Sequence, residues 1–352
     1  MNTEIIKLDK DNIDYGKLKY AAEAIINGGL VAFPTETVYG LGANALDEKA
    51  VRGIFSAKGR PSDNPLIVHI SEKSGLHELV REIPSDVYAL MEHFWPGPLT
   101  IVLKKSEKVP SVVSAGLDTV AVRMPSHPVA LELIKLAQVP VAAPSANSSG
   151  KPSPTCAEHV IEDLYGKVDM IIDAGEARVG LESTVLDMSA YPPVILRPGG
   201  VTPSQLKSVL GEVVIDPAVM AENDKTHFAP RAPGMKYAHY SPKADVIIVE
   251  GKIKNVAAKI LELARESKAA GGKPGIMATE QTMHLYGREA EVISMGDRDK
   301  PETIAASIFS ILRRFDELGI QVIFAEGVEN TGIGLAIMNR MRKAAANRVI
   351  KV

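Results

Sequence analysis

Three side chains that suit a phosphorylated ligand lie close together after a predicted helix. Lys58, Arg60 and Asn64 are spaced i, i+2 and i+6. Arginine offers a planar fork for phosphate oxygens, whereas lysine supplies a mobile point charge. Pro61 and Pro65 stiffen the loop, which reduces the entropy lost when these donors are held in place. The pattern predicts a polyphosphate clamp, and an ordinary basic helix terminus is the alternative interpretation.

These residues belong to a longer stretch, Val31 to Ile70, in which small and polar side chains surround two glycines. A predicted strand ends in a Thr-Glu-Thr turn that begins at Thr35, and Gly40 and Gly42 follow it. Small residues let a ligand approach the backbone closely. His69, at the end of the next predicted strand, is either a core histidine or a hydrogen-bond donor to a substrate.

Two arginines end predicted strands. Arg123 belongs to the strand pattern over 119–124, and Arg197 directly follows the pattern over 194–196. A proline follows each arginine within two residues. Burying a guanidinium without an anion is costly. The repeated pattern therefore favours a bound anionic group over a purely structural role.

The segment from Pro144 to Ser153 is rich in small hydroxyl and amide side chains and follows a predicted buried strand. Open α/β sheets bind ligands at the carboxyl ends of strands. A helix that starts near Thr155 can also present free N–H groups to an anion. A serine-rich surface loop is the alternative. We interpret Cys156 as a packing residue at the start of that helix rather than as a nucleophile.

The composition excludes several classes of protein. A net charge of −3 and a pI of about 6.3 give no global basic field for nucleic acid. One cysteine in 352 residues excludes an intramolecular disulfide and a multi-cysteine zinc site. No residues have zinc or EF-hand spacing, and no Gly-x-Ser-x-Gly elbow occurs. Neither a signal-peptide core nor an apolar run of transmembrane length is present, so we expect a soluble, cytoplasmic protein.

Hydrophobic periodicity predicts two α/β domains joined by a linker. Residues 1–212 mix helices and strands with mixed connectivity, and 213–243 form a proline-containing linker. From 244 onward, strands and helices alternate in a way typical of a small doubly wound, three-layer domain. That domain lacks the spaced glycines of a dinucleotide site, so we expect no cofactor there. The expected helices cover 15–27, 47–57, 128–137, 155–165, 253–267, 301–318 and 335–345, with one more capped by Thr202 or Ser204. The expected strands cover 30–33, 66–70, 99–103, 119–124, 139–143, 170–173, 183–188, 194–196, 246–249, 275–278, 292–295 and 322–325.

Taken together, seven segments closely resemble the threonylcarbamoyl-AMP synthase family, the YrdC-like enzymes in their longer, two-domain form. In chain order they are FPTETVYGLGANA, KGRPSDNPLIVHI, WPGPLT, TVAVRMP, APSANSSGKPSPT, STVLDM and ILRPGG. They spread over residues 14–205, and the segment APGMKYAHYSPKA with a Rossmann-like tail matches the longer form. The resemblance implies a twisted, mixed-sheet α/β catalytic domain followed by a small Rossmann-like α/β/α domain.

The family's reaction condenses L-threonine, bicarbonate and ATP into L-threonylcarbamoyl-adenylate and pyrophosphate. The product feeds N6-threonylcarbamoyladenosine formation in tRNA, through the threonylcarbamoyl transfer machinery. By resemblance, threonine is held by Thr35, His69, Arg123, Ala143 and Ser183. By resemblance, ATP is held by Arg60, Asn64, Thr119, Ser145, Ser153, Arg197 and the linker residue Tyr240. Lys58 and Arg60 are expected at the phosphates as the catalytic residues, and Mg²⁺ is expected with the nucleotide rather than in a protein metal site.

The residue chemistry agrees with this scheme. A guanidinium such as that of Arg123 pairs bidentately with an amino-acid carboxylate, and further cations suit a triphosphate. The N-carboxylate formed from threonine and bicarbonate attacks the α-phosphorus, which requires positioning and charge stabilisation but no covalent nucleophile. Because that intermediate is labile in water, we expect residues 213–243 to act as a lid that carries Tyr240 to the nucleotide.

Two other functions remain open from the sequence alone. A non-catalytic RNA-binding module is one, because YrdC-like domains have concave basic surfaces, although the acidic pI weighs against it. A carbamoyltransferase of hydrogenase maturation is the other, but those chains carry paired-cysteine zinc motifs that this chain lacks. The sequence leaves open the oligomeric state, direct tRNA contact, the role of the C-terminal domain and the selection of threonine over serine.

Overall fold

Two sheets organise the described residues, which are 2–220, 240–287 and 289–352 of this computed structural model. The N-terminal unit comprises Met1–Ser149 and Ser153–Tyr237, and the C-terminal unit comprises Gly150–Pro152 and Ala238–Val352. The predicted lid over 213–243 lies for the greater part outside the described residues. The two units are described separately below.

The N-terminal unit combines a mixed sheet with short helices. Its strands are β1 (Glu4–Lys7), β2 (Val31–Phe33), β3 (Gly40–Asn44), β4 (Ile67–His69), β5 (Leu99–Lys104), β6 (Thr119–Arg123), β7 (Val141–Ala142), β8 (Met170–Asp173), β9 (Thr184–Asp187), β10 (Val194–Arg197) and β11 (Val214–Ile215). Its helices are α1 (Tyr15–Ile26), α2 (Glu48–Lys58), η1 (Lys73–Gly75), α3 (Leu76–Leu79), α4 (Ser85–Phe94), α5 (Ser111–Ser114), α6 (Pro128–Ala137), α7 (Ala157–Leu164), α8 (Pro203–Leu210) and α9 (Pro217–Met220).

The strand order of this sheet is β1-β8-β2-β3-β7-β4-β6-β5-β9-β10-β11. At its centre β4 runs parallel to β6, and β7 runs antiparallel to β4. Further along, β5 is antiparallel to β6 and parallel to β9, which is antiparallel to β10. The described strands that carry the candidate site are therefore close together in the sheet, although they come from distant parts of the chain.

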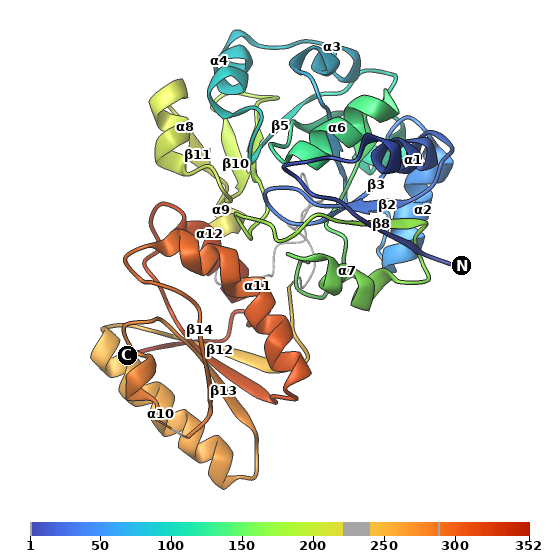
Figure 1. Cartoon of the computed structure of the whole chain (residues 1–352). Coiled ribbons are helices and arrows are strands. Elements are labelled where there is room, and N and C mark those ends of the chain that lie inside the picture. Colours follow the sequence, from blue (N-terminus) through green and yellow to red (C-terminus); the bar gives the residue numbers. More distant parts are fainter. Residues whose placement is uncertain (1, 221–239, 288) are drawn as a thin grey trace. The chain divides into compact units, whose positions relative to one another are not determined.

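Alternating side chains divide the core of the N-terminal unit between the two faces of the sheet. Successive strand residues point to opposite faces. In β2, Val31 and Phe33 pack with apolar residues of α1 and α6, whereas Ala32 packs in a separate cluster with residues of α2. Figure 1 shows α1 and α6 together beside these strands. The sheet is thus buried on both faces, as its apolar strands require.

The C-terminal unit is a parallel sheet flanked by three helices. Its elements are β12 (Asp245–Glu250), α10 (Ile253–Ala269), β13 (Pro274–Ala278), η2 (Met283–Leu285), β14 (Glu291–Ser294), α11 (Pro301–Glu317), β15 (Val322–Glu326), α12 (Gly334–Ala344) and β16 (Val349–Lys351). The strand order is β14-β13-β15-β12-β16, and these described strands all pair in parallel.

Right-handed crossovers decide which face each helix of this unit covers. The connection through α10 moves one way along the sheet, from β12 to β13, whereas α11 and α12 lead the other way. The helix α10 therefore packs on one face, and α11 and α12 pack together on the other (Figure 1). This is the predicted three-layer arrangement, and the predicted fold class is confirmed for both units. No helix among the described residues is long and apolar enough to cross a bilayer.

Strand β3 differs from the sequence expectation, which assigned the glycines of this segment to a ligand. Gly42 pairs with Val31 in the sheet. A Cβ atom on Gly42 would lie 2.7 Å from the Phe33 ring and 2.8 Å from Val141 Cγ1. Because this space is filled by core side chains, the small size of Gly42 serves packing rather than ligand access.

We expect the substitution Gly42→Ala to destabilise the protein by about 1–3 kcal/mol, because it overpacks a rigid core. Chemical denaturation measures the free energy of unfolding. Gly53→Ala in α2 is the matched control, since its Cβ atom would meet only Leu30, at 3.4 Å or more. There, alanine should stabilise the helix by roughly 0.5–1 kcal/mol. Equal stability of the two variants would contradict the packing role of Gly42.

Candidate active site

The candidate site is built around Arg123 at the end of β6. Its Nη2 atom pairs with Glu36 Oε1 at 2.8 Å, and both side chains are about 95% buried. Its Nη1 atom donates to Thr37 Oγ1 at 2.9 Å, and Nε donates to the Gly97 carbonyl oxygen at 3.2 Å. The turns before β3 and before β5 therefore both contact the Arg123 guanidinium.

The Arg123–Glu36 pair keeps both groups charged. Burial alone would raise the pKa of the Glu36 carboxyl, but the charge and hydrogen bond of Arg123 outweigh burial and hold that pKa below its usual range. A guanidinium has five N–H donors and stays protonated. The hydrogen bonds to Thr37 and Gly97 use two of them, and the contact with Glu36 is an ion pair, which leaves donors for the carboxylate of an amino acid.

The Thr-Glu-Thr turn that carries Glu36 is itself held by hydroxyl contacts. Thr35 Oγ1 donates to the Val38 carbonyl oxygen at 2.6 Å and lies 2.8 Å from Thr37 Oγ1. The turn therefore presents Thr35 and Thr37 as a pair, with Thr37 against Arg123. The sequence reasoning named Thr35 but missed Glu36 and Thr37. A carboxylate shortly after the apolar strand pattern over 30–33 was the available signal.

His69 lies directly opposite Arg123 in the pairing of β4 with β6. Its Nδ1 atom is 3.2 Å from the Ile67 carbonyl oxygen, and its ring meets Phe33 edge-on at 6.4 Å. Burial, assisted by the charge of Arg123, lowers the pKa of His69 to about 3. A neutral imidazole can exchange a hydrogen bond with a substrate but cannot act as the counter-ion of a carboxylate.

A second group of contacts extends from Arg123 across the neighbouring strands. Thr100 of β5 is the register partner of Arg123, and its hydroxyl lies 2.7 Å from Ser183 Oγ. Arg197, at the end of β10, donates to the Ser183 carbonyl oxygen at 3.0 and 3.1 Å. The structure thus places Arg123 at the end of β6, Ser183 just before β9 and Arg197 at the end of β10, with β5 between β6 and β9. Thr100 is a member of this group that the sequence reasoning did not identify.

Lys58 holds the serine-rich segment Pro144–Ser153. We call this segment the nucleotide loop, because it carries the predicted ATP residues Ser145 and Ser153. Its Nζ atom donates to the carbonyl oxygens of Ser145 and Asn147 at 2.5 Å each. Ser145 Oγ donates to Asn147 Oδ1 at 2.6 Å, and Ala143 N–H donates to the Ile67 carbonyl oxygen at 2.9 Å. The predicted phosphate residue Lys58 is therefore joined to the predicted nucleotide loop through main-chain oxygens.

Asn64 is a buried amide without a hydrogen-bond partner among the described residues. Its side chain is fully buried, and neither Oδ1 nor Nδ2 has a partner in that part of the chain. Arg60 Nη2 donates to the carbonyl oxygens of Asn64 and Pro65 at 3.3 Å. Because buried polar groups in native proteins are almost always paired, the Asn64 amide is a strong candidate to bind a ligand.

Two more predicted ATP residues, Thr119 and Ser153, lie at different edges of the sheet. Thr119 begins β6, and the parallel register with β4 places it level with Pro65, the residue after Asn64. Ser153 Oγ donates to Glu182 Oε1 at 2.5 Å, next in sequence to Ser183. The last predicted ATP residue, Tyr240, belongs to the C-terminal unit, where its ring stacks on Phe309.

Cys156 agrees with its interpretation as a packing residue. It precedes α7 as the N-cap and is partly buried. Burial raises the pKa of its thiol to about 11, so the thiol stays protonated near neutral pH.

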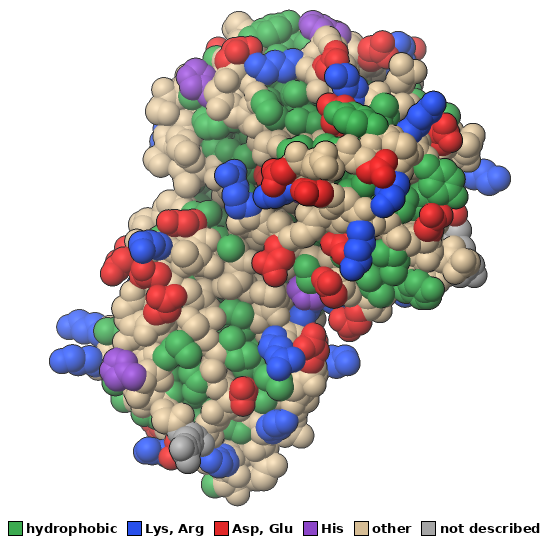
Figure 2. All heavy atoms as spheres, in the orientation of Figure 1, with side chains coloured by type: hydrophobic (Ala, Val, Ile, Leu, Met, Phe, Trp, Pro, Cys, Tyr) green, Lys and Arg blue, Asp and Glu red, His purple; other side chains and the backbone are tan. Residues whose placement is uncertain are grey.

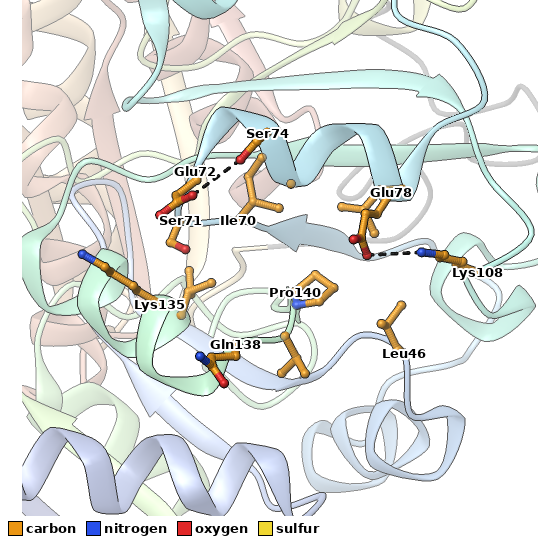
Figure 3. Close-up of a pocket in the computed structure, with 14 residues that line it drawn as sticks. Leu46, Ile70, Ser71, Glu72, Ser74, Glu78, Lys108, Lys135, Gln138 and Pro140 are labelled. Atoms are coloured by element: carbon orange, nitrogen blue, oxygen red, sulfur yellow. Dashed lines mark hydrogen bonds and ion pairs between the residues drawn. The ribbon is translucent and has the colours of Figure 1, made fainter.

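A separate hollow in the N-terminal unit does not contain these residues. It has a volume of about 430 Å³ and is lined by the loop after β4, by Lys108 and by the end of α6 (Figure 3). Its charged rim includes the ion pair of Glu78 with Lys108 at 3.4 Å, in which both side chains are exposed. Exposed pairs of this kind contribute little, and no predicted site residue lines the hollow.

The visible surface shows no large patch of one charge. Figure 2 shows Lys and Arg side chains interspersed with Asp and Glu side chains on the face in view. Among the described residues, no group of three or more His, Cys, Asp or Glu could hold a metal ion. The cations Lys58, Arg123 and Arg197 of the candidate site are instead buried.

The comparisons with known proteins point to one family. A family model described as telomere recombination matches residues 23–199, and one described as threonylcarbamoyl-AMP synthase, C-terminal domain, matches residues 201–346. The threonylcarbamoyl-AMP synthase of Pyrococcus abyssi is 54% identical over 343 residues, which cover 97% of this chain and 98% of that protein. The Bacillus subtilis threonylcarbamoyl-AMP synthase is 48% identical and covers 95% of this chain and 94% of its own length.

A solved structure points to the same family. The crystal structure of P. abyssi Sua5 complexed with L-threonine matches with a TM-score of 0.94 at 54% identity, covering 99% of this chain and 100% of that one. Fold and site define a two-domain α/β enzyme of the YrdC-like class. The chain belongs to the threonylcarbamoyl-AMP synthase family, in its long form, and the predicted resemblance is confirmed.

The low pKa of His69 predicts a pH dependence of stability. Its folded-state pKa of about 3 lies below the ordinary value of 6.5, so the unfolded chain takes up this proton first as the pH falls. The free energy of unfolding should decline between about pH 6.5 and pH 3. In His69→Gln, the decline measured by urea unfolding should be shallower by up to about 1.4 kcal/mol per pH unit.

His93→Gln, at an exposed histidine on α4, provides the matched control for the substitution itself. A His69→Gln slope equal to that of the wild type would show that burial of a neutral imidazole is the wrong description of this residue.

Proposed function

We propose that this chain is an L-threonylcarbamoyladenylate synthase and, by reaction class, a nucleotidyltransferase. The threonine amine adds to bicarbonate with loss of water, which gives an N-carboxylate. An oxygen of that carboxylate attacks the α-phosphorus of ATP, and pyrophosphate leaves. The product would be used in N6-threonylcarbamoyladenosine modification of tRNA, which fits a cytoplasmic site of action.

One observation supports this proposal: Ser183, a predicted threonine residue, accepts hydrogen bonds from Arg197, a predicted nucleotide residue. Arg123 offers a buried cation for the threonine carboxylate. Its register partner Thr100 contacts Ser183, and Ser183 accepts a hydrogen bond from Arg197. The two arginines can therefore hold a carboxylate and a phosphate at a fixed separation. Fixed positions for both reactants are the main requirement of such a transfer.

The proposed assignments follow the two groups of contacts. Thr35, His69, Ala143 and Ser183 surround threonine with Arg123. The ATP residues are Arg60, Asn64, Thr119, Ser145, Ser153, Arg197 and Tyr240. Lys58 fixes the Ser145–Asn147 main chain and adds positive charge beside the phosphates. Developing charge on the phosphates is stabilised best by such preorganised donors.

We propose that Mg²⁺ enters with the nucleotide. Mg²⁺ is usually held by phosphate oxygens, water and one or two carboxylates rather than by an all-protein cage. The described residues contain no acidic cluster that would serve as such a cage. Lys58, Arg60 and Arg197 would then neutralise the part of the phosphate charge that Mg²⁺ does not neutralise.

The direct test is mass spectrometry of the product formed from ATP, L-threonine and ¹³C-labelled bicarbonate. The expected result is a threonylcarbamoyl-adenylate that carries the label, together with pyrophosphate. Neither product should form when threonine is omitted. Conversion of ATP that does not depend on threonine and bicarbonate would contradict the proposal, and RNA binding without any conversion would favour the binding-module alternative.

The proposed phosphate contacts can be tested by substitution. Arg60→Ala and Arg197→Ala should each lower kcat/KM for ATP by roughly 10- to 100-fold, because each removes a charge-assisted hydrogen bond. Pyrophosphate release is the measurement. Arg52→Ala on α2 is the control, since Arg52 is exposed and pairs with Glu48. Full turnover in both site variants would show that the clamp is assigned to the wrong residues.

A further inference from the structure

One face of α11 holds two segments of the C-terminal unit, Gly150–Pro152 and 240–243. Phe309, Arg313 and Asp316 are spaced i, i+4 and i+7, so they lie along one side of the helix. Phe309 stacks on Tyr240 with a centroid distance of 5.1 Å. Arg313 donates to the Pro152 carbonyl oxygen, and Asp316 accepts from the Lys243 backbone N–H at 2.7 Å.

The contact of Arg313 with Pro152 is short and buried. The Nη2 atom lies 2.6 Å from the Pro152 carbonyl oxygen, and the Arg313 side chain is 97% buried. A second bond supports it, because Ser241 N–H donates to the Gly150 carbonyl oxygen at 3.0 Å. These bonds explain why Gly150–Pro152 belongs to the C-terminal unit, although the residues before and after belong to the N-terminal unit.

The orientation of the Pro152 carbonyl determines the direction of the Ser153 N–H in the nucleotide loop. The Pro152 carbonyl and the Ser153 N–H belong to one planar peptide. A hydrogen bond that fixes the carbonyl oxygen therefore also fixes the direction of the N–H. Ser153 is one of the proposed ATP residues, and its hydroxyl is held separately by Glu182. Arg313 and Glu182 together determine the main chain and the side chain of Ser153.

The same helix face also holds Tyr240, another proposed ATP residue. The Tyr240 ring lies against Phe309, and the Arg340 guanidinium carbon is 5.4 Å from the ring centroid. Cation–π contact at this distance is attractive. Tyr240 has a φ of 70°, which a non-glycine residue adopts only when its surroundings compensate. Phe309 and Arg340 supply that compensation.

We propose that Arg313 is a positioning residue for ATP, and that the α11 face of Phe309, Arg313 and Asp316 sets the geometry of the nucleotide loop. This inference rests on the function proposed above. Arg313 acts through Pro152 and Ser153 and needs no contact with the nucleotide. It gives the C-terminal unit a defined role in substrate binding.

The test is steady-state kinetics of the full-length chain with ATP and threonine varied separately. Arg313→Ala should raise KM for ATP about tenfold, in line with the loss of one charge-assisted hydrogen bond, and should leave KM for threonine unchanged. Arg313→Lys keeps a charged donor and should recover part of the loss. Arg314→Ala is the matched control, because Arg314 is the next residue on α11, is exposed and pairs with Glu317 at 2.8 Å.

The outcomes separate the possibilities. An unchanged KM for ATP in Arg313→Ala, or equal rises in both KM values, would overturn the positioning role. If Arg313→Ala does not fold, Arg313→Lys decides: a selective rise in KM for ATP supports the role, and wild-type kinetics overturn it. A wild-type chain that forms no labelled adduct would overturn the proposed function together with this inference, whereas an active wild type with an unaffected Arg313→Ala would overturn this inference alone.

Discussion

A buried arginine is the constraint on which the candidate site depends. Arg123 cannot lose its proton, so its surroundings must supply oxygens in a nearly dry interior. Glu36, Thr37 and Gly97 supply them from two separate turns, so burying one guanidinium fixes the position of both. A buried ion pair is weak evidence for stability, because desolvation can cost as much as the pairing contributes. A cation held in place before substrate arrives is, however, well suited to bind a carboxylate.

The mixed sheet explains how two substrates can meet beside this cation. Strands β4 and β6 are parallel, so their amino ends carry Asn64 and Thr119 and their carboxyl ends carry His69 and Arg123. Strand β7 is antiparallel to β4 and leads back toward the amino edge, where Ser145 begins the nucleotide loop. In the proposed enzyme, Asn64, Thr119 and Ser145 would hold the nucleotide from the amino edge of β4 and β6. Arg197 would reach it from the edge that carries Arg123 and Ser183.

Local patterns in the sequence predict much of the fold and the residue types of the site. The helix over 128–137 is predicted with its observed bounds, since Pro128 at its start and an apolar face define it. Strand β3 was missed, because glycine at positions 40 and 42 is unfavourable in strands and only the packing of the Phe33 ring explains Gly42. Glu36 was missed because its partner is far away in the chain. Pairings of that kind depend on tertiary structure, as does the contact of Arg313 with Pro152.

The central claim is that Arg123 binds the carboxylate of threonine. Calorimetric titration of L-threonine and of L-threoninamide, which lacks the negative charge, tests it in the wild-type chain and in Arg123→Gln. The account predicts that the wild type binds threonine at least about tenfold more tightly than the amide, as expected for a charged hydrogen bond. It also predicts that this preference disappears in Arg123→Gln, provided that circular dichroism shows the variant to be folded. A preference for threonine that is the same in both proteins would contradict the account.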